Sequence, residues 1–131
     1  MLNNVNVVVN ENPSELFFAT GSKVNNNDFI GLGIRGSVFV KNTIIAPKDC
    51  ELTSVTFSIR NTVPNSNITA EVWVNNALTL LSANIEDGNT TILSTGTGSV
   101  FVLQGDLISL KMQWNSGGNL PNGITASIAY R

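Results

Sequence analysis

Few residues in this chain could carry out catalytic chemistry. Histidine is absent, Cys50 is the single cysteine, and nine acidic residues are spread along 131 positions. Acid–base and nucleophilic mechanisms most often depend on His, or on a nucleophile that His activates. A glycosidase-type hydrolysis needs only two carboxylates in one cleft, and Glu71 with Asp106 or Glu86 could supply them. Because Glu71 stands on the polar side of an alternating segment, a solvated strand face is favoured, and we predict no enzyme activity.

Metal and cofactor sites are poorly supported by the same composition. One cysteine without histidine leaves no ligand set for a transition metal. The segment Glu86-Asp87-Gly88-Asn89 carries oxygen ligands for Ca²⁺ but lacks the ordered spacing of a calcium-binding loop, so a bound calcium ion stays an open alternative. Asp106, which follows a glycine, is expected to stabilise a turn with its carboxylate. We predict no cofactor and no metal site.

Two tryptophans could pack against a sugar ring or a partner. Trp114 shares its strand parity with Ile108 and Leu110, and is therefore expected in the core or in an interface. Trp73 has the opposite parity to Val72 and Val74, which predicts an outward-facing aromatic ring. We therefore interpret Trp73 as the candidate ligand contact, with a glycan or a neighbouring subunit as the group it touches.

Charge is scarce in this chain. Hydrophobic residues make up 42% and charged residues only 12%, about half the charged fraction of ordinary soluble domains. The net charge is −2 and the seven cations are scattered singly, which argues against a nucleic-acid partner. A surface with so few charges is covered by Asn, Ser, Thr and Gly, or is buried against other chains. We predict a homo-oligomer.

The sequence also bears on membranes and disulfides. No apolar run is long enough to span a bilayer. Residues 1–4 (MLNN) have neither the basic nor the apolar region of a secretory signal. A single cysteine cannot close an internal disulfide, so we expect Cys50 to be a buried or half-buried thiol in a fold held by packing.

Alternating apolar and polar residues predict strands through most of the chain. The clearest are residues 54–60, 68–74, 106–114 and 124–130, with turn residues at 75–76 and 104–105. Residues 5–9, 16–18, 37–40, 77–81 and 99–103 are further expected strands, and residues 95–98 are expected to lie before the last three-strand run. No segment carries helical spacing with caps. We predict one domain over residues 1–131, an all-β, jelly-roll-like sandwich of nine or ten antiparallel strands, in which residues 1–12 form a separate strand or an assembly arm.

Strand parity also predicts a core and an interface. The expected core residues are Phe17, Val55, Phe57, Ile59, Val72, Val74, Val100, Val102, Ile108, Leu110, Ile124 and Ile128. Some positions in the last two strands are apolar or small on both parities, which indicates burial on both faces. We therefore expect the oligomer interface to include Leu107, Trp114, Ala129 and Tyr130.

Several blocks of the chain are similar to one known class of domain. Residues 46–58 (APKDCELTSVTFS), 69–74 (TAEVWV) and 102–110 (VLQGDLISL) resemble the carboxy-terminal domain of collagen-like exosporium glycoproteins from spore-forming bacteria. The Gly-Asp-hydrophobic element and residues 123–130 (GITASIAY) resemble the broader class of tumour-necrosis-factor and complement globular-head domains. The resemblance covers most of the chain, from about Phe17 onward.

This resemblance implies a trimeric jelly roll at the tip of surface fibres. The domain would start trimerisation and contact the surroundings on the outer surface of a spore. A phage head fibre or virion decoration protein, which uses a similar trimeric jelly roll, is an alternative, and the chain would then be a complete short protein rather than an excised domain. An adhesin module that binds carbohydrate is the rival hypothesis from a different functional class.

Overall fold

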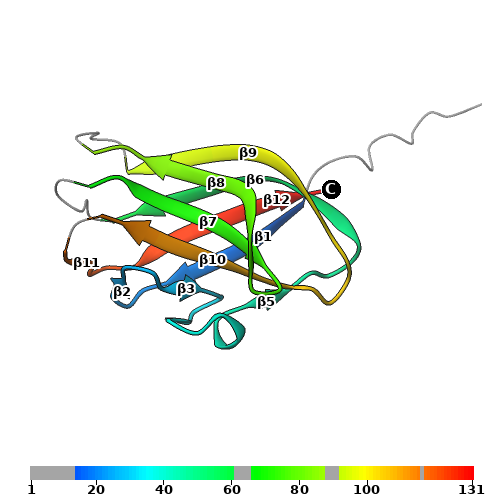
Figure 1. Cartoon of the computed structure of the whole chain (residues 1–131), viewed down its shortest axis with the longest axis horizontal. Helices are drawn as coiled ribbons and strands as arrows, with labels where there is room; N and C mark the ends of the chain where they lie inside the picture. Colours follow the sequence, from blue (N-terminus) through cyan, green and yellow to red (C-terminus); the bar gives the residue numbers. More distant parts are fainter. Residues whose placement is uncertain (1–13, 61–65, 88–91, 116) are drawn as a thin grey trace, which may run out of the picture.

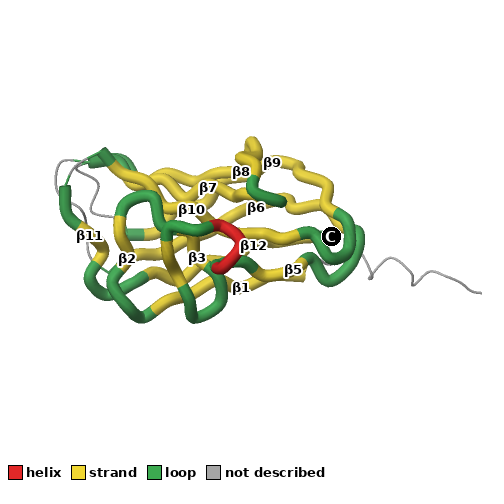
Figure 2. The backbone as a smooth tube through the Cα atoms, turned by 60° about the horizontal axis from the view of Figure 1, so that its bottom comes forward, coloured by secondary structure: helices red, strands yellow, loops and turns green. Residues whose placement is uncertain are grey.

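Two antiparallel sheets form the layers of the structure, a computed structural model that describes residues 14–60, 66–87, 92–115 and 117–131 (Figures 1 and 2). The first sheet has the order β1 (Ser14–Thr20), β12 (Ile124–Tyr130), β6 (Cys50–Ile59) and β9 (Leu93–Val102). The second has the order β4 (Arg35–Gly36), β3 (Phe29–Ile30), β10 (Leu107–Trp114), β7 (Ile68–Val74) and β8 (Ala77–Ile85), with β5 (Ile44–Ile45) also paired to β10. A short ladder joins β2 (Val24–Asn25) to β11 (Asn119–Leu120).

The order of the strands confirms the predicted all-β sandwich. Among the longer strands, only β7 and β8 follow each other in the chain and pair in one sheet. The connections β6–β7, β8–β9, β9–β10 and β10–β12 cross between the sheets, and between β1 and β6 the chain passes through β3, β4 and β5 of the second sheet. This alternation, with the first described strand beside the last, is jelly-roll-like. The described residues contain twelve strands rather than nine or ten, because residues 24–45 contribute four two-residue strands. The strand expected at residues 5–9 lies outside the described residues.

The strand predicted at residues 37–40 is wrong, because this segment turns. A 3-10 turn, η2 (Phe39–Lys41), lies between β4 and β5 and is coloured red in Figure 2. The side-chain amide of Asn42 donates to the carbonyl of Val38 at 2.8 Å, which closes the turn. Phe39 is buried, whereas Val38 and Val40 on either side of it are exposed. Over the described residues, no helix has the length and apolar character to cross a membrane.

Residues 95–98 do not precede a strand but lie inside β9. Along this part of β9 the backbone comes against β8, and the two strands run side by side along one edge of the sandwich (Figure 1). A Cβ atom at Gly96 would lie 1.7 Å from the carbonyl oxygen of Ser82. The hydroxyl of Ser94 donates to the carbonyl of Asn84 at 2.7 Å. Glycine in this strand therefore permits the two sheets to close at this edge.

The core lies between the sheets and follows the predicted parity with three exceptions. Phe17 was placed in the core by prediction but is 60% exposed, whereas Phe18 is fully buried. The register explains this, since Phe17 pairs with Ser127 on the outward side of β12. Val74 and Val100 are only partly buried and pack against the core margin. The other expected core residues are all buried.

Candidate functional site

The three carboxylates considered for catalysis are not brought together. Asp106 lies beside the β7–β8 turn, where its carboxylate accepts hydrogen bonds from the Leu103 amide at 2.8 Å and the Asn75 side chain at 3.1 Å. These two hydrogen bonds, the first being the larger effect, lower the pKa of Asp106. Glu86 follows the opposite end of β8, a nine-residue strand that spans roughly 30 Å. Asp106 and Glu86 therefore cannot face one cleft. Glu71 pairs in register with Lys111 and with Ser82, which lie five residues from Asp106 and four from Glu86 along the chain, so roughly 13–17 Å of strand separates Glu71 from either carboxylate.

Glu71 lies on the outward side of β7. Its carboxylate accepts a hydrogen bond from the indole N–H of Trp73 at 3.4 Å, and it pairs in register with Lys111 of β10. The described residues contain no cluster of three or more His, Cys, Asp or Glu side chains that could hold a metal ion. The calcium loop considered at residues 86–89 lies partly outside the described residues.

Trp73 is half-buried rather than open on the surface. The ring of Phe29 meets it edge-on, with centroids 5.2 Å apart and planes at 84°. The ammonium group of Lys111 lies 4.8 Å from the Trp73 centroid and 5.3 Å from that of Phe29. The chain's own groups therefore cover part of the ring that was predicted to contact a ligand.

The outward side of the first sheet has a central area of uncharged side chains, which we name the assembly face. Glu15, which pairs with Ala129, and Arg60, whose guanidinium donates to the Thr125 hydroxyl at 3.0 Å, lie at its margin. Its side chains are Phe17, Ala19, Ser54, Thr56, Ser58, Leu93, Thr95, Thr97, Thr125, Ser127 and Ala129. The hydroxyls of Thr56 and Thr95 bond to each other across β6 and β9 at 2.8 Å. A shallow hollow of about 180 Å³ lies on this face between Phe17 and Leu93. The floor is thus small and polar, with an exposed apolar side chain on either side.

Beside the assembly face, the edge formed by β8 and β9 carries large exposed apolar side chains. We name Leu78, Leu80 and Phe101 the edge patch, and they are 56%, 99% and 79% exposed. Leu80 lies where the register between β7 and β8 shifts. A leucine with essentially its whole side chain in water gains no hydrophobic stabilisation from its own chain.

Hydrogen bonds and an ion pair lie beside the assembly face at the amino end of β6. The carboxylate of Glu51 accepts hydrogen bonds from the Ser99 hydroxyl at 2.5 Å and from the Arg131 side chain at 3.2 Å. These bonds lower the pKa of Glu51, the Ser99 hydroxyl contributing most. Cys50 is buried, and its desolvation raises the pKa of the thiol. Glu51 thus links β6 to Ser99 of β9 and to Arg131, which follows β12, at this end of the sandwich.

The four residues predicted for the interface occupy different places. Ala129 is half-buried on the assembly face, where it pairs with Glu15 and Ser54. Tyr130 has the inward parity and packs against the core. Trp114 is only 4% exposed and belongs to the core, one of the two places expected for it, and its indole N–H donates to the carbonyl of Gly118. Leu107 lies on the second sheet.

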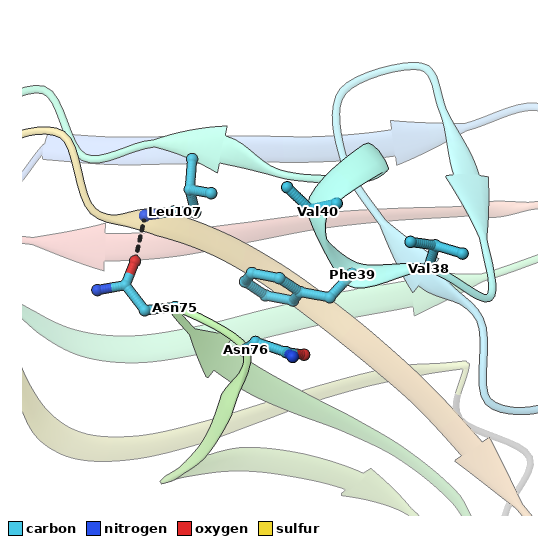
Figure 3. Close-up of a pocket in the computed structure, with 6 residues that line it drawn as sticks. All are labelled: Val38, Phe39, Val40, Asn75, Asn76 and Leu107. Atoms are coloured by element: carbon cyan, nitrogen blue, oxygen red, sulfur yellow. Dashed lines mark hydrogen bonds between the residues drawn. The ribbon is translucent and has the colours of Figure 1, made fainter.

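Leu107 is part of a surface hollow of about 360 Å³ (Figure 3). The hollow is lined by Val38, Phe39, Val40, Asn75, Asn76 and Leu107, none of which is charged. In Figure 3 the Phe39 ring lies between Leu107 and Val40 on one side and Asn76 on the other. This hollow was not predicted from the sequence, because residues 37–40, which include part of η2, were expected to form a strand.

Comparisons with protein-family models and with curated proteins find no match to this chain.

Proposed function

We propose that this chain is a non-catalytic structural domain that assembles as a homotrimer at the tip of a fibre on the surface of a spore or virion. The observation that carries the proposal is the assembly face with its neighbouring edge patch. Ser, Thr and Ala side chains are much less costly to remove from water than charged groups, so such a face can be buried without ionic partners. The low charge of the whole chain supports the same conclusion.

A cyclic trimer needs two different surfaces on each chain, because the contact between neighbours is heterologous. The assembly face supplies a flat surface, and the edge patch supplies projecting apolar side chains. We propose that the edge patch of one chain packs on the assembly face of the next, around a three-fold axis. Phe17 and Leu80, which are 60% and 99% exposed in the part of the chain that the structure describes, would then both leave water.

A role at the outer surface of a particle is supported by the sequence resemblance. The separation of the carboxylates supports a role without catalysis. The domain offers a core closed by its own two sheets and a surface suited to self-association. Antibodies against the purified domain should label intact spores or virions of the source organism. Labelling only after the particles are broken would overturn the surface location.

The oligomeric state is tested by light scattering coupled to size-exclusion chromatography. The wild-type chain should have three times the mass of one 14.0 kDa chain. Ser127→Glu places a carboxylate in the middle of the assembly face, where burial without a partner is costly, so this variant should run as a monomer. Gln113→Glu is the matched control, because Gln113 is equally half-buried and outward-facing but lies on the second sheet.

Circular dichroism should show the same strand content in both variants, so that dissociation is separated from unfolding. Leu80→Glu should also give monomers if the edge patch contacts the assembly face. A wild-type mass near 14.0 kDa would refute the trimer. Equal dissociation by Ser127→Glu and Gln113→Glu would refute the assignment of the contact to the first sheet.

A further inference from the structure

We propose that the hollow lined by η2, the β7–β8 turn and the start of β10 binds a neutral saccharide. This site does not depend on the proposed trimer, because it lies on the second sheet and contains no residue of the assembly face. Its volume of about 360 Å³ falls in the range of small-molecule sites. Three segments from distant parts of the sequence, two turns and the start of a strand, form its walls (Figure 3).

One wall is held rigidly in place. The backbone N–H of Asn75 donates to the Leu107 carbonyl at 2.8 Å, and the Leu107 N–H donates to the Asn75 side-chain oxygen at 2.9 Å. The Asn75 amide nitrogen donates in turn to Asp106 at 3.1 Å, so the side chain is fully engaged by its own chain. A turn fixed in this way presents the next residue, Asn76, in one position, which reduces the entropy lost when a ligand binds.

The choice of residue at position 76 points to a ligand. Asn75 and Asn76 have φ angles of 50° and 64°, both in the left-handed region that a two-residue hairpin turn requires. Glycine is the residue that such a turn favours at its second central position. This position is Asn76, and its exposed side-chain amide makes no hydrogen bond within the described residues. Its donor and its acceptor are both available at the mouth of the hollow.

The opposite wall is apolar. Phe39 is buried with 6% of its surface exposed, and Val40 beside it is 62% exposed. Leu107 completes this wall at the start of β10. No hydrogen bond joins η2 to the β7–β8 turn among the described residues, so a bound molecule would connect the two walls. The hollow thus offers one apolar side and one amide with paired donor and acceptor.

A pyranose ring matches these features better than other ligand classes. Its C–H face can pack on Val40, Leu107 and the rim of Phe39, while adjacent hydroxyls donate to and accept from the Asn76 amide. Phosphates, carboxylates and ammonium groups would find no opposite charge in the lining. A purely apolar peptide side chain would leave the Asn76 amide desolvated and unpaired, which is costly.

The site is tested by NMR titration of the isotope-labelled chain. D-glucose, D-galactose, D-mannose, L-rhamnose and N-acetyl-D-glucosamine are added in turn, and the Asn76 side-chain amide signals are followed. We expect at least one sugar to shift these signals saturably, with a dissociation constant of roughly 1 mM. Asn76→Gly preserves the turn geometry and should weaken binding by about tenfold or more.

Asn119→Ala is the control, because Asn119 belongs to β11 and lies away from the hollow. The affinity of this variant for the sugar should stay within about twofold of that of the wild type. No shift with any of the five sugars would overturn the proposal, as would full affinity in Asn76→Gly. Tighter binding of glucose 6-phosphate than of glucose would overturn the neutral ligand class. Displacement of the dye 8-anilinonaphthalene-1-sulfonate by apolar peptides but by no sugar would instead assign the hollow to a protein partner.

Discussion

Replacing Gly96 by Ala tests how closely the two sheets approach at the β8–β9 edge. The added Cβ would lie 1.7 Å from the Ser82 carbonyl oxygen and 2.7 Å from its carbonyl carbon, both backbone atoms of β8. No side-chain rotation can relieve this overlap, so β8 and β9 must move apart by more than an ångström. Overpacking of this kind costs about 3 kcal/mol or more, which corresponds to a melting temperature lower by roughly 10 °C.

Gly98→Ala is the matched control on the same strand. Its Cβ would meet the Cδ1 atom of Leu81 at 3.3 Å, the far end of a flexible side chain. This substitution also restricts the unfolded chain, so its net effect should lie within about 1 kcal/mol of zero. Both variants are melted at one fixed protein concentration and followed by circular dichroism. Equal melting temperatures for Gly96→Ala and Gly98→Ala would show that the two strands are not in backbone contact.

Two further predictions concern the core and the margin of the first sheet. Phe57 is fully buried, so Phe57→Ala should lower the free energy of unfolding, measured in urea, by about 3–5 kcal/mol. Thr56→Ala on the outward side should lower it by less than about 1 kcal/mol. Similar losses in the two variants would mean that the strand register is wrong. Ser99→Ala should raise the pKa of Glu51 toward its ordinary value in a carboxyl NMR titration, because the Ser99 hydroxyl is the main cause of the lowering. Because the pKa of Glu51 is lower in the folded chain than in the unfolded chain, the stability that Glu51 contributes is present above the unfolded pKa and fades as the pH falls below about 4. Ser99→Ala should therefore lose less stability on acidification than the wild type. An unchanged pKa of Glu51 in Ser99→Ala would contradict the hydrogen bond.

The sequence allowed the sheets to be predicted where polar and apolar residues alternate strictly. The segments expected at residues 54–60, 68–74, 106–114 and 124–130 all form strands, to within one residue at each end of the expected range, because a buried face fixes their register. Prediction failed at Phe17 and Phe18, two adjacent aromatics of which only one can point inward. Only the pairing with Ser127 on β12 decides between them. It also failed at residues 37–40, where a side-chain bond from Asn42 favours a turn over β-branched strand propensity.

The candidate site was predictable only in part. Scarcity of charge indicated a surface for self-association, and Ala129 lies on the face where that surface is proposed. The location of the surface on the first sheet required the strand order, which joins β1, β12, β6 and β9 from distant parts of the chain. The hollow at Asn76 was not predictable for the same reason. Asn-Asn signals a turn in the sequence, but nothing in its spacing shows that η2 lies opposite.

The place of β12 in the first sheet has a consequence for synthesis. β12 lies between β1 and β6 and pairs with both, over Ser14–Thr20 on one side and most of Cys50–Ile59 on the other. A chain emerging from the ribosome amino end first therefore holds β1 without its neighbour until residues 124–130 are made. Pairings between such distant segments form late and slowly. The assembly face is therefore complete only after β12 has been made and has paired with β1 and β6.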